Sequence, residues 1–325
     1  MDHTSGSVRR APYFQLRRWS WVSDLTVNLA GIKMKNPVMS ASGTFGSGVE
    51  YATVFDVSRM GALVTKGLTK EARAGNKPPR ICETPAGLLN AVGLQNPGVE
   101  VFIRDLLPEM LEFGVPVIAN IAGNTSDEFV YLAERLSNTG VAGLEVNISC
   151  PNVKTGGMAL GTVPEVAAEV VKAVVQATDL PVIVKLTPNV TDIRELAQAV
   201  AEAGADAISL INTLVGMVID VDKRKPLLGN CIGGLSGPAI RPVGVRAVWE
   251  VSQLVDIPII GMGGITTGRD ALEYIMAGAT AVAVGSAFFH DPLAAVKIID
   301  ELEQYCTDQC VEKLQDLVGV AWKDN

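Results

Sequence analysis

The segment GLEVNISCPN, residues 143–152, combines the pattern of a buried strand with side chains that could do chemistry. Apolar residues alternate with polar ones, and the segment then ends on Asn147, Ser149 and Cys150. Pro151 has no backbone N–H to donate and therefore ends the strand. A strand that finishes on an amide, a hydroxyl and a free thiol indicates a site at that strand end.

Polar side chains and glycines follow the other apolar segments in the same way. The residues at or near these ends are Ser42, Lys66, Gly67, Asn120, Lys185, Asn212, Thr213, Gly263, Gly264, Gly285 and Ser286. The whole set holds lysines, asparagines and one thiol, but no cluster of histidines or carboxylates. A histidine-rich metal site and a Ser-His-Asp triad are therefore not expected. Of the two histidines, His3 is near the terminus, and we interpret His290, beside Asp291, as structural.

Glycines follow the last two apolar segments, as GMGG at 261–264 and GS at 285–286. Such turns let backbone amides approach a phosphate, although plain tight turns are the alternative. Together with the amide side chains they predict a phosphorylated cofactor, and flavin mononucleotide (FMN) fits well. Its ring needs hydrogen-bond donors near N1 and O2, where charge builds on reduction, and Lys185 could supply one.

The elements that must position these residues follow a regular rhythm. Eight short apolar segments, with helical patterns between them, lie at 37–43, 62–67, 116–123, 143–150, 181–188, 207–213, 258–264 and 281–287. Most of these segments are continuous apolar runs, which are typical of parallel strands covered on both faces. The spacing predicts an α/β fold, a (β/α)8 TIM barrel, with a doubly wound open sheet as the competitor. Helices are expected over 163–178 and 191–205.

Two connections, 68–115 and 214–257, are too long for simple crossovers. Each is expected to hold a helix plus extra loop. In a barrel such insertions lie at the C-terminal mouth, where catalytic residues also gather. We therefore predict inserted loops that shape the active-site mouth.

Composition excludes several classes of protein. The chain has 325 residues, a net charge of −8 and a pI near 5.0, which argues against nucleic acid as a partner. No run of 18 apolar residues occurs, so no transmembrane helix is expected. The odd number of widely spread cysteines, five, argues against a disulfide framework, a zinc site or an iron–sulfur cluster, and suits a reducing cytoplasm.

The domain organisation is predicted to be simple. Residues 1–23 are basic, carry two tryptophans and are expected to form a flexible extension, with contact to a membrane surface or a partner as the alternative. They lack the apolar core of a secretory signal. Residues 24–325 are expected to form one barrel domain.

Six motifs, in order, resemble the class 1 dihydroorotate dehydrogenases, and the 1B catalytic subunit most of all. They are LLNAVGLQNPG (88–98), NISCPNVKTGG (147–157), KLTPNVTDI (185–193), INTLVG (211–216), GGLSGPAIRP (233–242) and IIGMGGI (259–265). The resemblance runs from about residue 24 to about residue 310. It implies oxidation of (S)-dihydroorotate to orotate in de novo pyrimidine (UMP) synthesis, with a proton leaving C5 and a hydride passing from C6 to the flavin.

The resemblance also implies roles for residues. Cys150 matches the catalytic base, and its pKa must be lowered from the usual value of about 8.5 or activity must rise with pH. The substrate-binding residues it implies are Lys66, Asn90, Ala91, Val92, Gly93, Leu94, Asn147, Asn212 and Thr213. The FMN-binding residues it implies are Ser42, Lys66, Gly67, Asn120, Asn147, Lys185, Ile211, Gly237, Gly263, Gly264, Gly285 and Ser286. We interpret the remaining cysteines as buried and inert, with two of them on one helix face: Cys82, Cys231, Cys306 and Cys310.

The 1B resemblance implies a cytoplasmic heterotetramer: a homodimer of this chain with two subunits that carry FAD and a [2Fe–2S] cluster and pass electrons to NAD⁺. The alternatives are a fumarate-dependent class 1A enzyme and a dihydropyrimidine dehydrogenase subunit. A Schiff-base aldolase or lyase using Lys66 or Lys185, and an idle binding scaffold, are more distant alternatives. Cys150 argues against class 2 enzymes, which use a serine base and a membrane domain.

Overall fold

The computed structural model of the chain describes residues 23–148 and 160–323. Each predicted apolar segment contains one strand of a single sheet. These strands are β3 (Val38–Ser40), β4 (Leu63–Val64), β7 (Val117–Ile121), β8 (Gly143–Asn147), β9 (Val182–Lys185), β10 (Ala207–Leu210), β15 (Ile259–Met262) and β16 (Ala281–Val284). The strands are shorter than the predicted segments, because the polar residues at the segment ends lie in the loops beyond them.

The sheet closes into a barrel. Neighbouring strands follow in the order β3-β16-β15-β10-β9-β8-β7-β4, and every pair is parallel. A parallel bridge between Met39 and Ala62 joins the two end strands. The predicted (β/α)8 TIM barrel is confirmed, and the open sheet is excluded.

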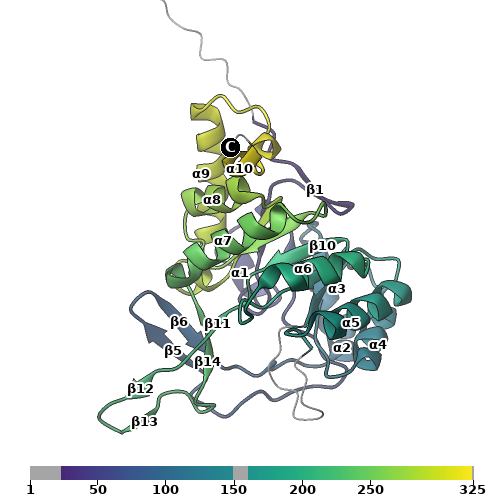
Figure 1. Ribbon diagram of the computed structural model, residues 1–325, viewed down its shortest axis with the longest axis vertical. Coiled ribbons are helices and arrows are strands. Elements are labelled where there is room, and N and C mark those ends of the chain that lie inside the picture. The colour runs from purple at the N-terminus through teal and green to yellow at the C-terminus, as the bar shows by residue number, and fades with distance from the viewer. Residues whose placement is uncertain (1–22, 149–159, 324–325) are drawn as a thin grey trace, which may run out of the picture.

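Helices cover the outside of the barrel (Figure 1). The α-helices are α1 (Val49–Ala52), α2 (Val99–Val101), α3 (Leu107–Glu112), α4 (Ser126–Leu136), α5 (Pro164–Ala177), α6 (Ile193–Glu202), α7 (Arg241–Ser252), α8 (Gly268–Ala277), α9 (Ala294–Asp308) and α10 (Val320–Lys323). A π-helical turn, η2 (Phe102–Leu106), joins α2 to α3, and short 3₁₀ turns are η1 (Val57–Arg59), η3 (Pro238–Ile240), η4 (Ser286–Phe289) and η5 (Leu314–Leu317). The helices expected at 163–178 and 191–205 are confirmed as α5 and α6. The second begins at Ile193, and the side chain of the preceding Asp192 accepts from the backbone N–H of Arg194 at 2.9 Å and caps the helix.

The N-terminal end of the barrel is plugged by an apolar hairpin. Strands β1 (Val27–Leu29) and β2 (Ile32–Met34) pair antiparallel across this end. Their buried residues belong to the same cluster as the inward residues of the barrel, such as Ile118, Ile183 and Ile260. Burial of this apolar surface excludes water from the lower half of the barrel. Polar chemistry is thereby confined to the opposite end.

The two insertions form more regular structure than expected. Helix η2–α3 and helix α7 confirm the helical part of the prediction, but four strands of the insertions also pair antiparallel in the order β11-β14-β6-β5. They are β11 (Leu214–Gly216), β14 (Gly233–Ser236), β6 (Gly87–Asn90) and β5 (Ile81–Thr84), and a further pair is β12 (Ile219–Asp220) with β13 (Lys225–Pro226). The sequence analysis did not predict these strands within the extra loops, because pairing between residues 144 apart, such as Asn90 and Gly234, leaves no local pattern in short glycine-rich strands. Figure 1 shows this sheet at one end of the molecule and β1 toward the other.

Within the described part of the chain, no helix is both long and apolar enough to cross a membrane. Residues 1–22, most of the predicted extension, lie outside the described residues. The division at residue 24 therefore stays a prediction.

Candidate active site

A polar layer lies above the apolar filling of the barrel, across β7 to β10. Asn120 is fully buried, and its Nδ2 donates to Glu145 Oε2 at 2.6 Å. The other oxygen of Glu145 accepts from Ser209 Oγ at 2.7 Å. Lys185, 5% exposed, is paired in register with Asn147 on one side and Ser209 on the other. The structure therefore brings the predicted residues Asn120, Asn147 and Lys185 together.

The loop after β4 reaches this layer. A Cβ on Gly67 would come within 3.0 Å of both Asn120 Oδ1 and Leu94 Cδ2, so these three predicted residues are neighbours. The preceding Lys66 is half-buried, and its pKa is lowered by burial and, to a smaller extent, by the nearby guanidinium of Arg80. Two cationic groups at a partly buried position favour an anionic ligand there.

The predicted substrate loop after β6 has a fixed backbone. The backbone N–H of Asn76 donates to the carbonyl of Val92 at 3.0 Å, and Asn76 Nδ2 donates to the carbonyl of Ala91 at 2.9 Å. Gly93 has a φ of 77°, and a Cβ there would lie 2.6 Å from Asn76 Cγ. Glycine is required at this position, because both its conformation and its surroundings exclude a side chain.

Three distant segments meet at the mouth through the inserted sheet. Asn90 Nδ2 donates to the carbonyl of Gly234 at 3.3 Å, and a Cβ on Gly234 would overlap Thr213 Oγ1. Asn212 Oδ1 accepts from the backbone N–H of Thr213 at 2.8 Å, and Asn189 Nδ2 donates to the Thr213 carbonyl at 2.9 Å. The predicted substrate residues from 88–98 and 211–216 thus lie side by side.

The predicted glycine turns after β15 and β16 also converge. Gly263 and Gly264 have φ of 121° and 72°, and a Cβ on Gly264 would lie 2.6 Å from the carbonyl oxygen of Gly237. A pocket of about 340 Å³ opens beside them, lined among others by Gly237, Thr266 and Ser286. Gly237, Thr266 and Ser286 therefore line one cavity, and Gly264 packs against Gly237 at its edge.

The wall of the same pocket carries Glu83, His290 and Asp291. We interpreted His290 as structural, but its exposed side chain lines the cavity. Asp291 accepts from Lys297 Nζ at 2.6 Å, a hydrogen bond that lowers the carboxyl pKa. The positive charge of Lys297 therefore offsets part of the negative charge that Asp291 and Glu83 bring to the wall of the pocket.

The remaining predicted cofactor residues lie next to these turns. A Cβ on Gly285 would contact Ala41 Cβ at 3.4 Å, so Gly285 is beside the turn that holds Ser42. The backbone N–H of Ile211 donates to the carbonyl of Met262 at 3.1 Å. Since β10 lies between β9 and β15, the lysine and amide group and the glycine turns occupy neighbouring sectors of one rim.

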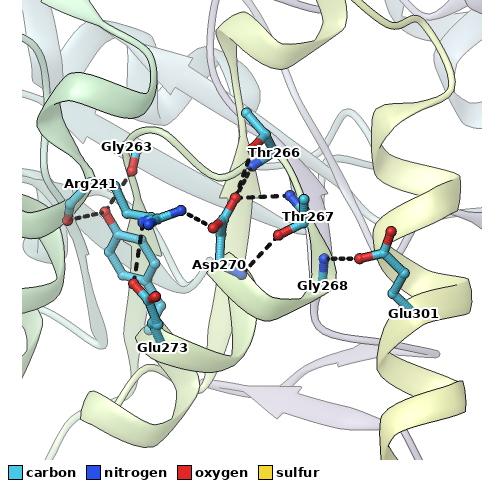
Figure 2. A network of polar contacts seen from close by, with 9 residues as sticks. Arg241, Gly263, Thr266, Thr267, Gly268, Asp270, Glu273 and Glu301 are labelled. Carbon is cyan, nitrogen blue, oxygen red and sulfur yellow. Dashed lines mark hydrogen bonds and ion pairs between the residues drawn. The ribbon is translucent and has the colours of Figure 1, made fainter. Parts of the chain in front are cut away.

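A buried carboxylate holds the loop that follows the glycine turn (Figure 2). Asp270, 5% exposed, accepts from the backbone N–H of Thr266 at 2.9 Å, from its hydroxyl at 2.7 Å and from the N–H of Thr267 at 3.0 Å. It also forms an ion pair with Arg241. Thr267 and Asp270 form a reciprocal capping box at the start of α8. One side chain thus fixes both the helix end and the loop.

Tyr274 fixes the glycine turn itself. Its hydroxyl donates to the carbonyl of Gly263 at 2.7 Å, and the carbonyl of Met262 lies 3.2 Å away. The side chain is fully buried, and burial raises the pKa of its hydroxyl well above the usual value. The phenol therefore stays a donor at physiological pH.

Cys150, the predicted base, lies with residues 149–159 outside the described residues. Cys82 and Cys306 are buried, and burial raises the pKa of both thiols, as an inert role requires. The expectation that Cys231 and Cys310 are buried was wrong, because both are exposed. Cys310 also lies beyond the end of α9, with a φ of 56°, and so does not share a helix face with Cys306.

Comparison with known proteins decides the family. The dihydroorotate dehydrogenase family model matches residues 24–306. The chain belongs to the dihydroorotate dehydrogenase family. A relative from Desulforudis audaxviator (strain MP104C), named dihydroorotate dehydrogenase B (NAD(+)), catalytic subunit, is 62% identical over 296 residues, which cover 91% of this chain and 96% of the relative. A relative of the same name from Geobacter sp. (strain M21) is 56% identical over 297 residues, which cover 91% of this chain and 97% of the relative.

The resemblance to class 1B drawn from the motifs is thereby confirmed. Dihydroorotate dehydrogenases are flavin-dependent enzymes, and the donor set of this site fits a phosphorylated flavin. Lysine and amide side chains lie in one sector of the rim and would donate hydrogen bonds to a flavin ring there. The glycine turns and the pocket lie in the neighbouring sector, where the phosphate of the flavin would bind. When bound, the flavin would supply hydride acceptance, which no side chain provides.

Sequence reasoning missed the residues of this dihydroorotate dehydrogenase that hold the polar layer and the loops of the site in place. They are Arg80, Glu145, Ser209, Arg241, Asp270 and Tyr274. The T-x-x-D spacing of Thr267 and Asp270 was the one local signal available. Across the described ranges, no three side chains of His, Cys, Asp or Glu gather as a metal site would require.

Proposed function

We propose that this chain is the catalytic subunit of an NAD⁺-linked dihydroorotate dehydrogenase. It oxidises (S)-dihydroorotate to orotate for de novo pyrimidine synthesis. The observation that carries the proposal is the meeting of two lysines and several amides at the barrel mouth of a chain 62% identical to a relative of that name. Amides donate and accept hydrogen bonds, which suits a planar ring with alternating groups.

Each residue has a proposed role. Lys66, Asn147, Asn212, Thr213 and residues 90–94 would bind the pyrimidine and its carboxylate. Cys150 would take the proton from C5 of the substrate, and the bound FMN would supply the acceptor for the hydride from C6. The FMN would be held by Ser42, Lys66, Gly67, Asn120, Asn147, Lys185, Ile211, Gly237, Gly263, Gly264, Gly285 and Ser286. The positions of those residues that are described support a single elongated ligand across the rim.

A partner subunit would complete the enzyme. The words "catalytic subunit" in the names of the relatives support a partner, and "NAD(+)" supports its role as the route to that acceptor. We propose a cytoplasmic heterotetramer, in which a dimer of this chain binds two subunits that carry FAD and a [2Fe–2S] cluster. Purification with native partners and an absorbance spectrum test this: flavin bands alone would contradict the complex.

Substrate identity is tested by anaerobic titration of the purified holoprotein. Dihydroorotate should bleach the yellow flavin absorbance stoichiometrically, and dihydrouracil should not. Bleaching by dihydrouracil would instead favour a dihydropyrimidine dehydrogenase subunit. Turnover with fumarate in place of NAD⁺ and the partner would favour the class 1A alternative, which the names of the relatives disfavour.

The base is tested by Cys150→Ala, with Cys231→Ala as the matched control, since Cys231 is an exposed free thiol with no proposed role. Cys150→Ala should keep the flavin and lose about 10²-fold or more of dihydroorotate oxidation. Cys231→Ala should match the wild type. Normal turnover by Cys150→Ala would contradict the assigned base.

A further inference from the structure

One buried carboxylate has no part in the proposed chemistry. Glu145 is 2% exposed, lies on β8 two residues before Asn147, and faces the barrel interior. Its oxygens accept from Asn120 Nδ2 at 2.6 Å and from Ser209 Oγ at 2.7 Å, and both partners are themselves fully buried. Burying a carboxylate is costly unless it is paired, so a packing role alone does not explain an ionisable residue here.

Glu145 decides which end of the Asn120 amide faces the mouth. The amide nitrogen is held by the carboxylate, so the carbonyl oxygen Oδ1 faces Asn147 Nδ2, at 3.5 Å, and Gly67. A flipped amide would bring two oxygen atoms, both acceptors, into contact at the carboxylate, which would be repulsive. The carboxylate therefore acts through Asn120 on any ligand above it.

Glu145 also places a negative charge on the strand next to that of a buried lysine, two residues before the position that pairs with it. The hydrogen bond from Ser209 on β10 to Glu145 on β8 spans β9, where Lys185 is in register with Ser209 and Ile183 is in register with Glu145. Both side chains are at least nine-tenths buried. Charges in this poorly solvated environment interact more strongly than they would in water.

We propose that Glu145 is a positioning residue that fixes the Asn120 amide and partly offsets the Lys185 charge beneath the flavin, lowering the reduction potential of the flavin. The inference rests on the proposed function for the identity of the cofactor. The sign follows from electrostatics: reduction adds negative charge to the ring, and a nearby carboxylate opposes that charge.

The test is the midpoint potential of the bound flavin, measured by spectroelectrochemistry on the holoprotein without substrate. Glu145→Gln keeps the shape, the acceptor for Asn120 and a partner for Ser209, but removes the charge. It should shift the two-electron reduction equilibrium at least tenfold toward the reduced form, which is about 30 mV in the positive direction. Ser209→Ala, the matched control, loses one hydrogen bond but keeps the charge and should shift the potential much less.

Two further variants separate charge from position. Lys185→Met should lower the potential, and adding Glu145→Gln should restore much of it. Glu145→Asp keeps the charge but withdraws it from Asn120, so it should weaken flavin binding severalfold with little change in potential. This variant decides the positioning claim if Glu145→Gln does not fold.

A potential unchanged in Glu145→Gln, or shifted equally in Ser209→Ala, would overturn the charge assignment, and tight flavin binding by Glu145→Asp would overturn the positioning. In either case the proposed oxidation of dihydroorotate would stand. A wild-type chain that binds no flavin would overturn the proposed function and this inference together.

Discussion

The hydroxyl of Tyr274, on α8, donates a 2.7 Å hydrogen bond to the carbonyl oxygen of Gly263, in the turn after β15. The donor side chain is fully buried, so it is shielded from bulk water. The turn that we propose to face the flavin phosphate is thus held from the outer side of the barrel, by a residue of helix α8.

Replacing Tyr274 with phenylalanine should destabilise the protein by about 1–3 kcal/mol, because the carbonyl of Gly263 loses its buried donor. We expect weaker retention of the flavin as well, since the turn is then less constrained. Thermal or urea unfolding and flavin content on dialysis measure the two effects. Tyr131→Phe, which removes an exposed hydrogen bond to Glu100, is the control and should change stability by no more than about 0.5 kcal/mol. Equal losses of stability in the Tyr274 and Tyr131 variants would contradict the proposal that Tyr274 holds the glycine turn in place.

Gly244 on α7 should not tolerate a methyl group. A Cβ there would overlap the hydroxyl oxygen of Tyr274 and lie 3.1 Å from the carbonyl of Met262. Gly244→Ala should therefore cost about 1–3 kcal/mol of unfolding free energy, despite the better helix propensity of alanine. Val243→Ala, at an exposed position of the same helix, serves as the control.

The same contact predicts a coupling between the two sites. In the double variant Gly244→Ala with Tyr274→Phe, the overlapping oxygen is gone and the nearest ring atom, Cζ, would lie at 3.0 Å. The loss of stability should then be smaller than the sum of the single losses, by about 0.5 kcal/mol or more. Strict additivity in a double-mutant cycle would contradict the close packing of α7 against Tyr274.

Lys66 should give anion binding a pH dependence. Burial and Arg80 hold the pKa of Lys66 below the usual 10.5, so the ammonium is lost at a lower pH than from an exposed lysine. Binding of orotate, titrated by its perturbation of the flavin spectrum, should weaken as the pH rises through that lowered pKa. Lys66→Arg should remove the dependence, because arginine stays charged, while exposed Lys70→Met should leave it unchanged. A wild-type midpoint at 10.5 or above would contradict the prediction.

The contribution of Lys66 to folding stability should change with pH in the opposite direction to its contribution to orotate binding. Between the lowered pKa of the folded state and the ordinary pKa of 10.5, the unfolded chain holds more protons at this residue than the folded chain does. Stability attributable to Lys66 therefore rises with pH across that window, as the cost of burying the ammonium disappears. Comparing the pH dependence of unfolding in the wild type and in Lys66→Met checks the sign.

The cysteines should differ in reactivity. Cys231 and Cys310 are exposed, whereas Cys82 and Cys306 are buried with raised thiol pKa values. Alkylation of the native protein at pH 8, read by mass spectrometry of peptides, should modify the first two and spare the second two. Rapid native modification of Cys306 would contradict its burial, and unfolding in urea should make all of them reactive.

Much of the architecture was predictable because its signals are local. Continuous apolar segments, one per barrel strand, mark a parallel sheet, and glycines mark the turns after the last two strands. Asp192 caps the start of α6, as its side-chain type suggests. The antiparallel sheet over the mouth was not predictable, because Leu235 pairs with Leu89 and no local pattern links residues so far apart.

The sequence by itself determined the barrel, the family and the set of side chains available at the strand ends, since residue type and spacing along the chain carry all three. Only the tertiary structure decided how that set is held. Glu145 and Ser209 lie 64 residues apart and meet inside the barrel, and Arg241 and Asp270 meet outside it. Such pairs form only when strands and helices from distant segments pack side by side. The local sequence pattern around each residue does not indicate which distant residue it will contact.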